Sequence, residues 1–166
     1  MELQNENFNN LYVNSKIKFA DKLLYERNKK VIMVYIYDTF GLRDKRNKLI
    51  TIWLNQLIKN KPVTIYSAKT VINISSNKFV SKLLANSIKL NAGKYEIRSE
   101  IEMSLIELYE FLKKITNSKS ELIIKNFKPI KIIKKYKNIS DILKIKYTMN
   151  DFEKDLREII HREFKW

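Results

Sequence analysis

Cysteine is absent from the 166 residues, and histidine occurs once, as His161. The sequence therefore excludes disulfides, thiolate zinc sites and cysteine nucleophiles. Glycine and proline occur twice each, and because Gly41 and Gly93 are isolated, there is no glycine-rich phosphate loop. The longest apolar run, Val31 to Tyr37, is far too short to span a bilayer. Residues 1–7 have no basic region followed by an apolar one, so we expect no secretory signal.

Positive charge is what the sequence has in excess. Lys and Arg number 33 against 18 Asp and Glu, a net charge of +15. Such a charge suits a polyanion, with nucleic acid as the first candidate and an anionic membrane as the second. Between Lys113 and Lys146, lysines far outnumber acids and Tyr136 lies among them, a pattern that favours phosphate contacts and base stacking. The alternative is a solvated polar face in a lysine-rich proteome, which explains the charge of the whole chain less well.

Hydrophobic periodicity predicts a series of helices and strands. The predicted helices cover 11–27, a segment after Asp44, a segment from Ser104 with a capping box to Glu107, and a last segment opened by Asn150 and Glu153. The predicted strands cover 31–37, 63–66, 95–103, 122–124, 130–133 and 143–147. Residues 73–93 are interpreted as an extended basic loop with a short helix inside it.

These elements predict the α+β class. A single antiparallel sheet with helices packed on one face and an open basic face fits them best. The chain length predicts one domain over residues 1–166, with an N-terminal helical segment at 1–28.

The sequence offers little for catalysis. His161 lies beside Arg162 and Glu163, which favours a solvated surface position over a catalytic one. The carboxylates of Glu96, Glu100 and Glu102 could resemble a metal site, and a metal-dependent nuclease is a third possible function. With Arg98 between them, a solvated charged face is the favoured interpretation. We therefore expect no enzyme activity, no catalytic residue, no metal and no cofactor.

Five short segments resemble, in order, the large-subunit ribosomal protein L-five family over roughly residues 11–112. The segments are Lys30–Ile36, Ile58–Val63, Lys69–Val71, Lys89–Gly93 and Leu108–Leu112. The last 25 residues, with Ile145–Thr148 before an acidic helix start, resemble the family more faintly. The sequence departs from the family pattern at Val34, Ile88 and Glu102, and about fifteen residues near 73–87 look inserted. So much drift indicates a divergent mitochondrial form.

The resemblance implies a structural constituent of the large ribosomal subunit, in its central protuberance. The implied partners are large-subunit rRNA, 5S rRNA or its replacement, P-site tRNA, small-subunit protein S-thirteen and other large-subunit proteins. The predicted RNA-binding residues are Asn60, Lys61, Tyr66, Lys69, Lys78, Lys82, Lys89, Lys94, Lys144 and Lys146. The expected location is the mitochondrion, with a plastid or a low-GC bacterial cytoplasm as alternatives. The alternative function is a free-standing basic RNA-binding module that stays off ribosomes.

Overall fold

The structure, a computed structural model, describes residues 11–25, 30–44, 46–125, 127–129, 132 and 134–164. The helices are α1 (Leu11–Tyr25), α2 (Leu49–Ile58), α3 (Asn77–Ser87), α4 (Leu105–Ile115), α5 (Ile139–Leu143) and α6 (Met149–Phe164). The strands are β1 (Ile32–Ile36), β2 (Asp38–Phe40), β3 (Val63–Ile65), β4 (Val71–Ser76), β5 (Gly93–Ile97), β6 (Glu102–Ser104), β7 (Leu122–Ile124) and β8 (Lys137–Asn138). Among the described residues, no helix is long and apolar enough to cross a membrane.

Strand pairing is mainly parallel. One sheet has the order β1-β5-β8 and a two-stranded sheet pairs β3 with β7, all in parallel. The third sheet, β2-β4-β6, combines the parallel pair β2–β4 with the antiparallel pair β4–β6. The predicted α+β class is confirmed, whereas the predicted single antiparallel sheet is wrong. The reason is that strands alternate with helices along the chain, and a parallel neighbour needs such a long connection.

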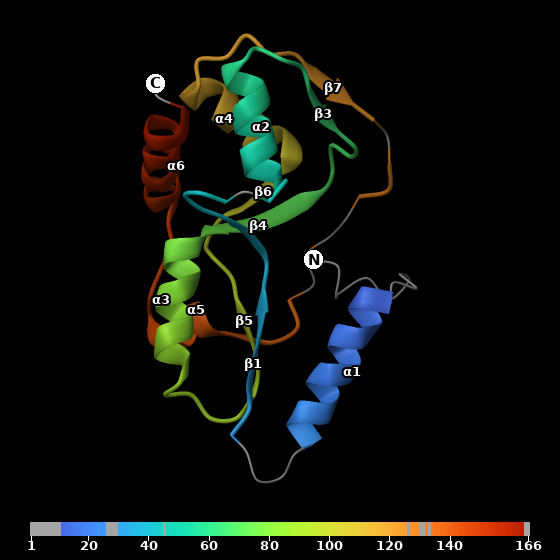
Figure 1. Cartoon of the computed structure of the whole chain (residues 1–166), viewed down its shortest axis with the longest axis vertical. Coiled ribbons are helices and arrows are strands. Elements are labelled where there is room, and N and C mark those ends of the chain that lie inside the picture. Colours follow the sequence, from blue (N-terminus) through green and yellow to red (C-terminus); the bar gives the residue numbers. More distant parts are fainter. Residues whose placement is uncertain are drawn as a thin grey trace.

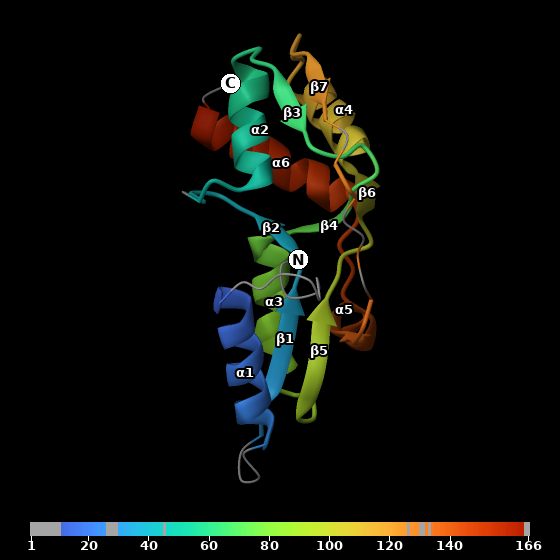
Figure 2. The same ribbon diagram turned by 90° about the vertical axis from the view of Figure 1, so that its right-hand side faces the viewer.

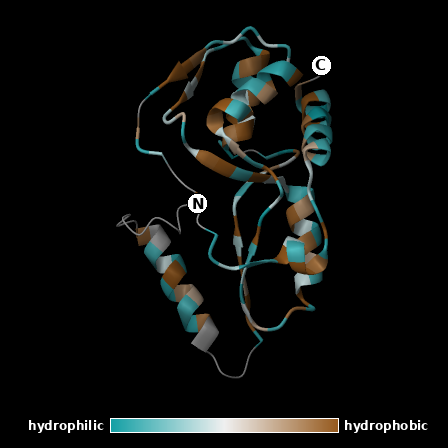
Figure 3. Cartoon of the chain, turned by 180° about the vertical axis from the view of Figure 1, so that it is seen from behind, coloured by the Kyte–Doolittle hydropathy of each residue, from teal (hydrophilic) through white to brown (hydrophobic). Residues whose placement is uncertain are grey.

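The three sheets occupy different parts of an elongated molecule (Figure 1). The strands β1 and β5 lie at one end with α1, α3 and α5, and the pair β3–β7 lies at the other end with α2, α4 and α6. The strands β4 and β6 cross between these two groups. In the side view, β1 and β5 run side by side toward the group formed by α2, α4 and α6 (Figure 2). The helices carry both hydrophobic and hydrophilic residues, as expected for helices with one buried face (Figure 3).

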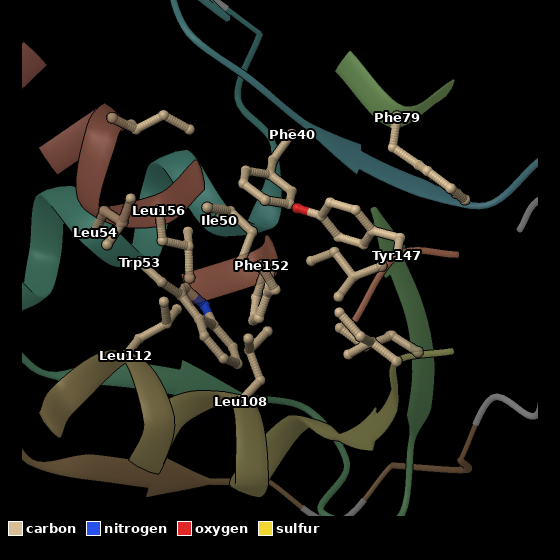
Figure 4. Close-up of a cluster of buried hydrophobic side chains, with 14 of the residues drawn as sticks. Phe40, Ile50, Trp53, Leu54, Phe79, Leu108, Leu112, Tyr147, Phe152 and Leu156 are labelled. Atoms are coloured by element: carbon tan, nitrogen blue, oxygen red, sulfur yellow. The ribbon is translucent and has the colours of Figure 1, made fainter. Parts of the chain in front are cut away.

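A hydrophobic cluster of buried residues connects these parts. Trp53 of α2, Leu112 of α4 and Leu156 of α6 are buried in it (Figure 4). Phe152 lies between two aromatic rings, with ring centroids 5.3 Å from Phe40 and 5.4 Å from Phe111. Fully burying a side chain of this size contributes about 1.5–3 kcal/mol, so these contacts fix how the helices pack on the central strands.

Of the two predicted helix caps, the structure confirms one and corrects the other. The predicted capping box of α4 is confirmed, because Ser104 and Glu107 each accept a backbone N–H from the other residue. At the start of α6 the predicted pair Asn150–Glu153 is wrong. Asp151 instead accepts from the N–H and hydroxyl of Thr148, because the helix begins two residues earlier than the predicted cap pair indicates.

Two predicted segments fold differently. Residues 73–93 form the end of β4, the eleven-residue helix α3 and a turn into β5, rather than an extended loop. Ser76 makes this possible by accepting the N–H of Phe79 as the N-cap of α3. The predicted strand 143–147 is wrong, since Leu143 ends α5 and Lys144 adopts the left-handed conformation. The predicted strand 130–133 lies almost entirely outside the described residues.

Candidate functional site

A cavity of about 740 Å³ lies between α2, β3 and the start of α4. Its size is within the range of small-molecule sites, which are concave and mainly apolar with a few polar groups. The apolar lining comes from Leu49, Ile52, Trp53, Ile65, Ile72 and Leu105. The polar lining comes from Asp38, Gln56, Thr64, Ser67, Thr70 and Lys128, with Tyr66 and Phe127 also at the cavity.

Asp38 is the unusual polar group of this cavity. It is the first residue of β2, just beyond the carboxyl end of β1, where ligands bind in open α/β sheets. Its Oδ2 atom is buried and has no hydrogen-bond partner among the described residues. Burial raises the pKa of this carboxyl, while the charge of Lys48 acts in the opposite direction. A lining acceptor without a partner is available to an N–H or O–H group of a ligand.

An aromatic pair stands at the same cavity. The rings of Tyr66 and Phe127 meet edge to face with centroids 5.6 Å apart, and Lys125 Nζ lies 5.3 Å from the Tyr66 ring centroid. The main chain holds this pair, because Ile65 accepts the N–H of Lys125 and Tyr66 accepts the N–H of Phe127. Since Tyr66 remains 58% exposed, its ring is accessible to a planar ligand group.

These features together select a ligand class. The apolar walls and the aromatic pair suit a planar ring, and Asp38 suits a hydrogen-bond donor. Lys125 and Lys128 supply positive charge beside them, on a chain of net charge +15. The cavity therefore fits an organic anion with a flat ring and exchangeable N–H or O–H groups.

The ten predicted RNA-binding residues are distributed over several elements and connections. Only Tyr66 lines the large cavity. Asn60 has a left-handed backbone after α2, and its Oδ1 accepts from Lys119 N–H at 2.8 Å and from the Ser118 hydroxyl at 3.2 Å. Lys94 of β5 is paired with Asp21 of α1 at 3.2 Å. Lys61, Lys69, Lys89 and Lys144 lie in the connections between elements. Contact of these ten residues with RNA stays a prediction.

Lys78, Lys82 and Lys146 are brought together around a hollow of about 290 Å³ between α3 and the start of α6. Acids share this hollow, and Lys78 is ion-paired with Glu158 and, at 3.6 Å, with Asp155. Lys146 is paired with Glu100 at 2.7 Å. Two of these three lysines are thus already neutralised by carboxylates.

The three glutamates of the possible metal site have protein partners. Glu96 is fully buried, is ion-paired with Arg98 and accepts the Tyr37 hydroxyl at 3.1 Å. Glu102 is paired with Lys134 at 3.0 Å, and Glu100 with Lys146. Within the described part of the chain, no group of three His, Asp or Glu residues could hold a metal ion. His161 lies on an exposed position of α6.

Reasoning from the sequence missed Asp38 and Phe127. A signal for Asp38 was present, because it is an acid placed directly after the apolar run Val31–Tyr37, where a parallel strand would end. Phe127 had no such signal. Its place beside Tyr66 depends on the parallel pairing of β3 with β7, which joins residues about 60 positions apart.

No family model and no curated protein sequence matches the chain. Several solved structures match its fold. The UDP-N-acetylglucosamine 4-epimerase from Methanobrevibacter ruminantium, in complex with UDP-N-acetylmuramic acid, gives a TM-score of 0.73 at 17% identity, over 98% of this chain and 56% of that one. The UDP-glucose 4-epimerase from Thermotoga maritima, with UDP-glucose, gives 0.73 at 15% identity, over 91% of this chain and 52% of that one.

A UDP-glucuronic acid 4-epimerase from Bacillus cereus, in complex with UDP-glucuronic acid and NAD, gives a TM-score of 0.72 at 15% identity, over 91% of this chain and 52% of that one. At such identities the likeness shows the fold, which is Rossmann-like with mainly parallel strands. The chain spans about half the length of these structures.

This likeness corrects the resemblance to the ribosomal protein L-five family. The structural neighbours are UDP-sugar epimerases, so the ribosomal function, the free-standing RNA-binding module and the rRNA, tRNA and S-thirteen partners were wrong. The matching motifs misled because they are packing and turn residues. Leu108, Tyr109 and Leu112 are the buried face of α4, and Pro62 lies in the turn from α2 to β3. Such features recur in unrelated folds. The mitochondrial location stays a prediction.

Proposed function

We propose that this chain is the sugar-nucleotide-binding part of an enzyme that converts UDP-sugars, with the nucleotide held in the cavity between α2, β3 and α4. The observation that carries the proposal is the combination, in one cavity, of the Tyr66–Phe127 pair and the Asp38 Oδ2 atom, which has no hydrogen-bond partner among the described residues. A uracil ring suits an aromatic surface, and its N–H and the ribose hydroxyls suit a carboxylate acceptor. Ligands bound in the structural neighbours, UDP-glucose and UDP-glucuronic acid among them, belong to this class.

Charge supports the same ligand. A diphosphate carries negative charge, and the lysines at positions 48, 125 and 128 lie at or near the cavity. The N-terminus of α2 follows Lys48 and has no side-chain cap, so its backbone N–H groups remain available to an anion. Binding is therefore expected to weaken as salt is added, because salt screens exposed charges.

A test is titration of the full 166-residue chain with UDP-glucose, UDP, ATP and glucose by calorimetry. We expect UDP-glucose and UDP to bind and glucose alone to fail. Tyr66→Ala should weaken binding of UDP by about 1–3 kcal/mol, the usual cost of losing a base-stacking ring. The matched control is Ile88→Ala, which truncates another exposed apolar side chain, in the turn between α3 and β5. Binding of ATP as tight as that of UDP, or equal effects of the two variants, would count against the proposal.

NAD is bound in some of the structural neighbours, and the described residues of this chain do not fit it. A dinucleotide site uses a glycine-rich turn between a strand and a helix. Here Ser76 and Ser104 cap the N-termini of α3 and α4 with their own side chains. An added Cβ at Gly41 would lie 2.6 Å from Asn77 Nδ2, so this glycine serves a close packing contact. We therefore derive no chemical step through NAD on these residues.

A further inference from the structure

Tyr35 of β1 and Tyr136, the residue before β8, have stacked rings. The ring centroids are 4.6 Å apart and the ring planes are inclined by only 15°. This is the close, offset arrangement that aromatic pairs favour. Among the aromatic contacts of the described residues, it is the one that joins two tyrosines. The stack therefore brings two phenol groups from distant parts of the sequence into direct contact.

The sheet β1-β5-β8 holds the two tyrosines together. In the register of β1 with β5, Tyr35 pairs with Glu96. Glu96 is fully buried, and its Oε2 atom accepts the backbone N–H of Tyr136 at 3.3 Å. Beyond this bond, β8 pairs with β5, with Asn138 opposite Glu96. Because Glu96 on the middle strand is tied to both sides, the stack is a fixed feature of the fold rather than a chance meeting of side chains.

The hydroxyl ends of the two rings lie together. Burial and, after it, hydrogen bonding with the Tyr136 hydroxyl raise the pKa of Tyr35 to about 12. Two stacked rings whose hydroxyls are within hydrogen-bonding reach point the same way, so the ring carbons beside the hydroxyls face each other as well. Both side chains are half-buried, and a cavity of about 500 Å³ between β1 and α1 reaches Tyr35. A small reagent therefore has access to the pair.

We propose that Tyr35 and Tyr136 form an oxidative modification site, at which a one-electron oxidant joins β1 to the segment before β8 through a dityrosine bond. Each phenol gives one electron to the oxidant and one proton to water, and two equivalents of oxidant are reduced. The two neutral radicals then form a C–C bond between the carbons beside the hydroxyls. The hydrogens on these carbons shift as protons to the oxygens, which restores both phenols. Overall the chain loses two hydrogen atoms.

The bond would be a covalent staple in a chain that has no cysteine and so cannot form a disulfide. Two reacting groups held in contact couple within one molecule faster than groups that must meet by diffusion. A crosslink between distant parts of the chain also restricts the unfolded state, which stabilises the folded one. The site is independent of the UDP cavity, and failure of UDP binding would leave the proposal standing.

The test oxidises the full 166-residue chain at micromolar concentration with a photoexcited ruthenium complex and persulfate. Dityrosine fluorescence gives the yield, and mass spectrometry identifies the joined tryptic peptides. We expect a monomeric product in which the peptide with Tyr35 is linked to the peptide with Tyr136, two hydrogens lighter than their sum. The yield should fall about tenfold when the chain is oxidised in urea, because unfolding separates the rings. The crosslinked monomer should unfold at a higher urea concentration than the untreated protein.

Conservative variants identify the two partners. Tyr35→Phe and Tyr136→Phe each keep the ring and lose the phenol hydroxyl, so we expect unchanged circular dichroism and a yield about tenfold lower. The matched controls are Tyr37→Phe, in the same tryptic peptide as Tyr35, and Tyr66→Phe, at an exposed tyrosine. Both controls should keep the wild-type yield. Dityrosine confined to dimers, a yield no higher than in urea, or an undiminished yield in Tyr35→Phe or Tyr136→Phe would overturn the proposal.

Discussion

The contribution of Asp38 to the free energy of unfolding depends on pH. Burial raises its folded-state pKa above the ordinary value, so the folded state holds the proton more tightly than the unfolded state does. The contribution of this group to the free energy of unfolding is therefore greatest below the unfolded-state pKa. It falls as the pH rises through the raised folded-state pKa. Above the folded-state pKa the carboxylate is destabilising, because its buried Oδ2 atom has no hydrogen-bond partner among the described residues.

We expect Asp38→Asn to remove this dependence and to leave the protein as stable as the wild type, or more so, at pH 7. Urea unfolding at several pH values between 4 and 8 measures it, and the gap between the two proteins should close at low pH. In the UDP titration the same variant should bind more weakly, because the amide is a poorer acceptor. A wild-type stability that rises with pH over this window would contradict the expected shift, provided Asp38→Asn does not share the rise.

Glu96 is also a buried acid, but unlike Asp38 its carboxylate oxygens have several hydrogen-bond donors. Besides Arg98 and Tyr37, the backbone N–H groups of Lys135 and Tyr136 reach its Oε2 at 3.3 Å. We expect Glu96→Ala to lower the free energy of unfolding by about 3–5 kcal/mol, because Arg98 and the other donors lose their partner. The control is Glu100→Ala, which removes an exposed carboxylate paired with Lys146 and should change stability little. Similar losses in both variants would argue against this role for Glu96.

At the scale of elements, the capping box of α4 is the local signal that the sequence and the structure share. We expect Ser104→Ala to lower the free energy of unfolding by about 1 kcal/mol, because the N–H of Glu107 loses its acceptor. Ser81→Ala, at an exposed position inside α3, is the matched control and should be neutral or slightly stabilising. Chemical denaturation of both variants measures the difference. An unchanged midpoint for Ser104→Ala would show that tertiary contacts alone hold this helix.

The elements that the sequence predicted well are those set by local patterns. The helices α1, α2, α4 and α6 and the strands β1 and β3 lie close to their predicted positions. The pairing of strands was not predictable in the same way, because parallel partners such as Ile32 and Gly93 are far apart in the sequence. In the segment 143–147, by contrast, the local pattern itself predicted the wrong element. Its alternation of apolar residues and lysines indicated a strand, but Lys144 turns left-handed to end α5.

Among the described residues, a continuous hydrophobic cluster runs from Ile97 of β5 to Leu156 of α6. A single domain over the chain stays a prediction, and it has a direct test. We expect cooperative unfolding, in which the fluorescence of the buried Trp53 and the far-UV circular dichroism change at the same urea concentration. A Trp166→Phe background leaves Trp53 as the sole indole. Two separate transitions would show that the ends of the molecule unfold independently.

The candidate site was harder to predict than the fold, and the reason is geometric. Tyr66 was singled out as an RNA contact, whereas Asp38 was not singled out from the sequence at all. Their meeting at one cavity requires α2 to lie across β3 and β4, which no local pattern specifies. The high net charge favoured a nucleic acid, but it is equally compatible with a small phosphorylated ligand.

The register between β1 and β5 has a consequence during synthesis. Ile32 pairs with Gly93, so the nascent strand emerges about 60 residues before its partner, a wait of several seconds at about 5–20 residues per second. Throughout that interval both edges of an uncharged, β-branched segment are exposed to other nascent chains. The yield of native protein from a cell should therefore depend on the speed of translation and on holding chaperones, more than on the final free energy of the fold.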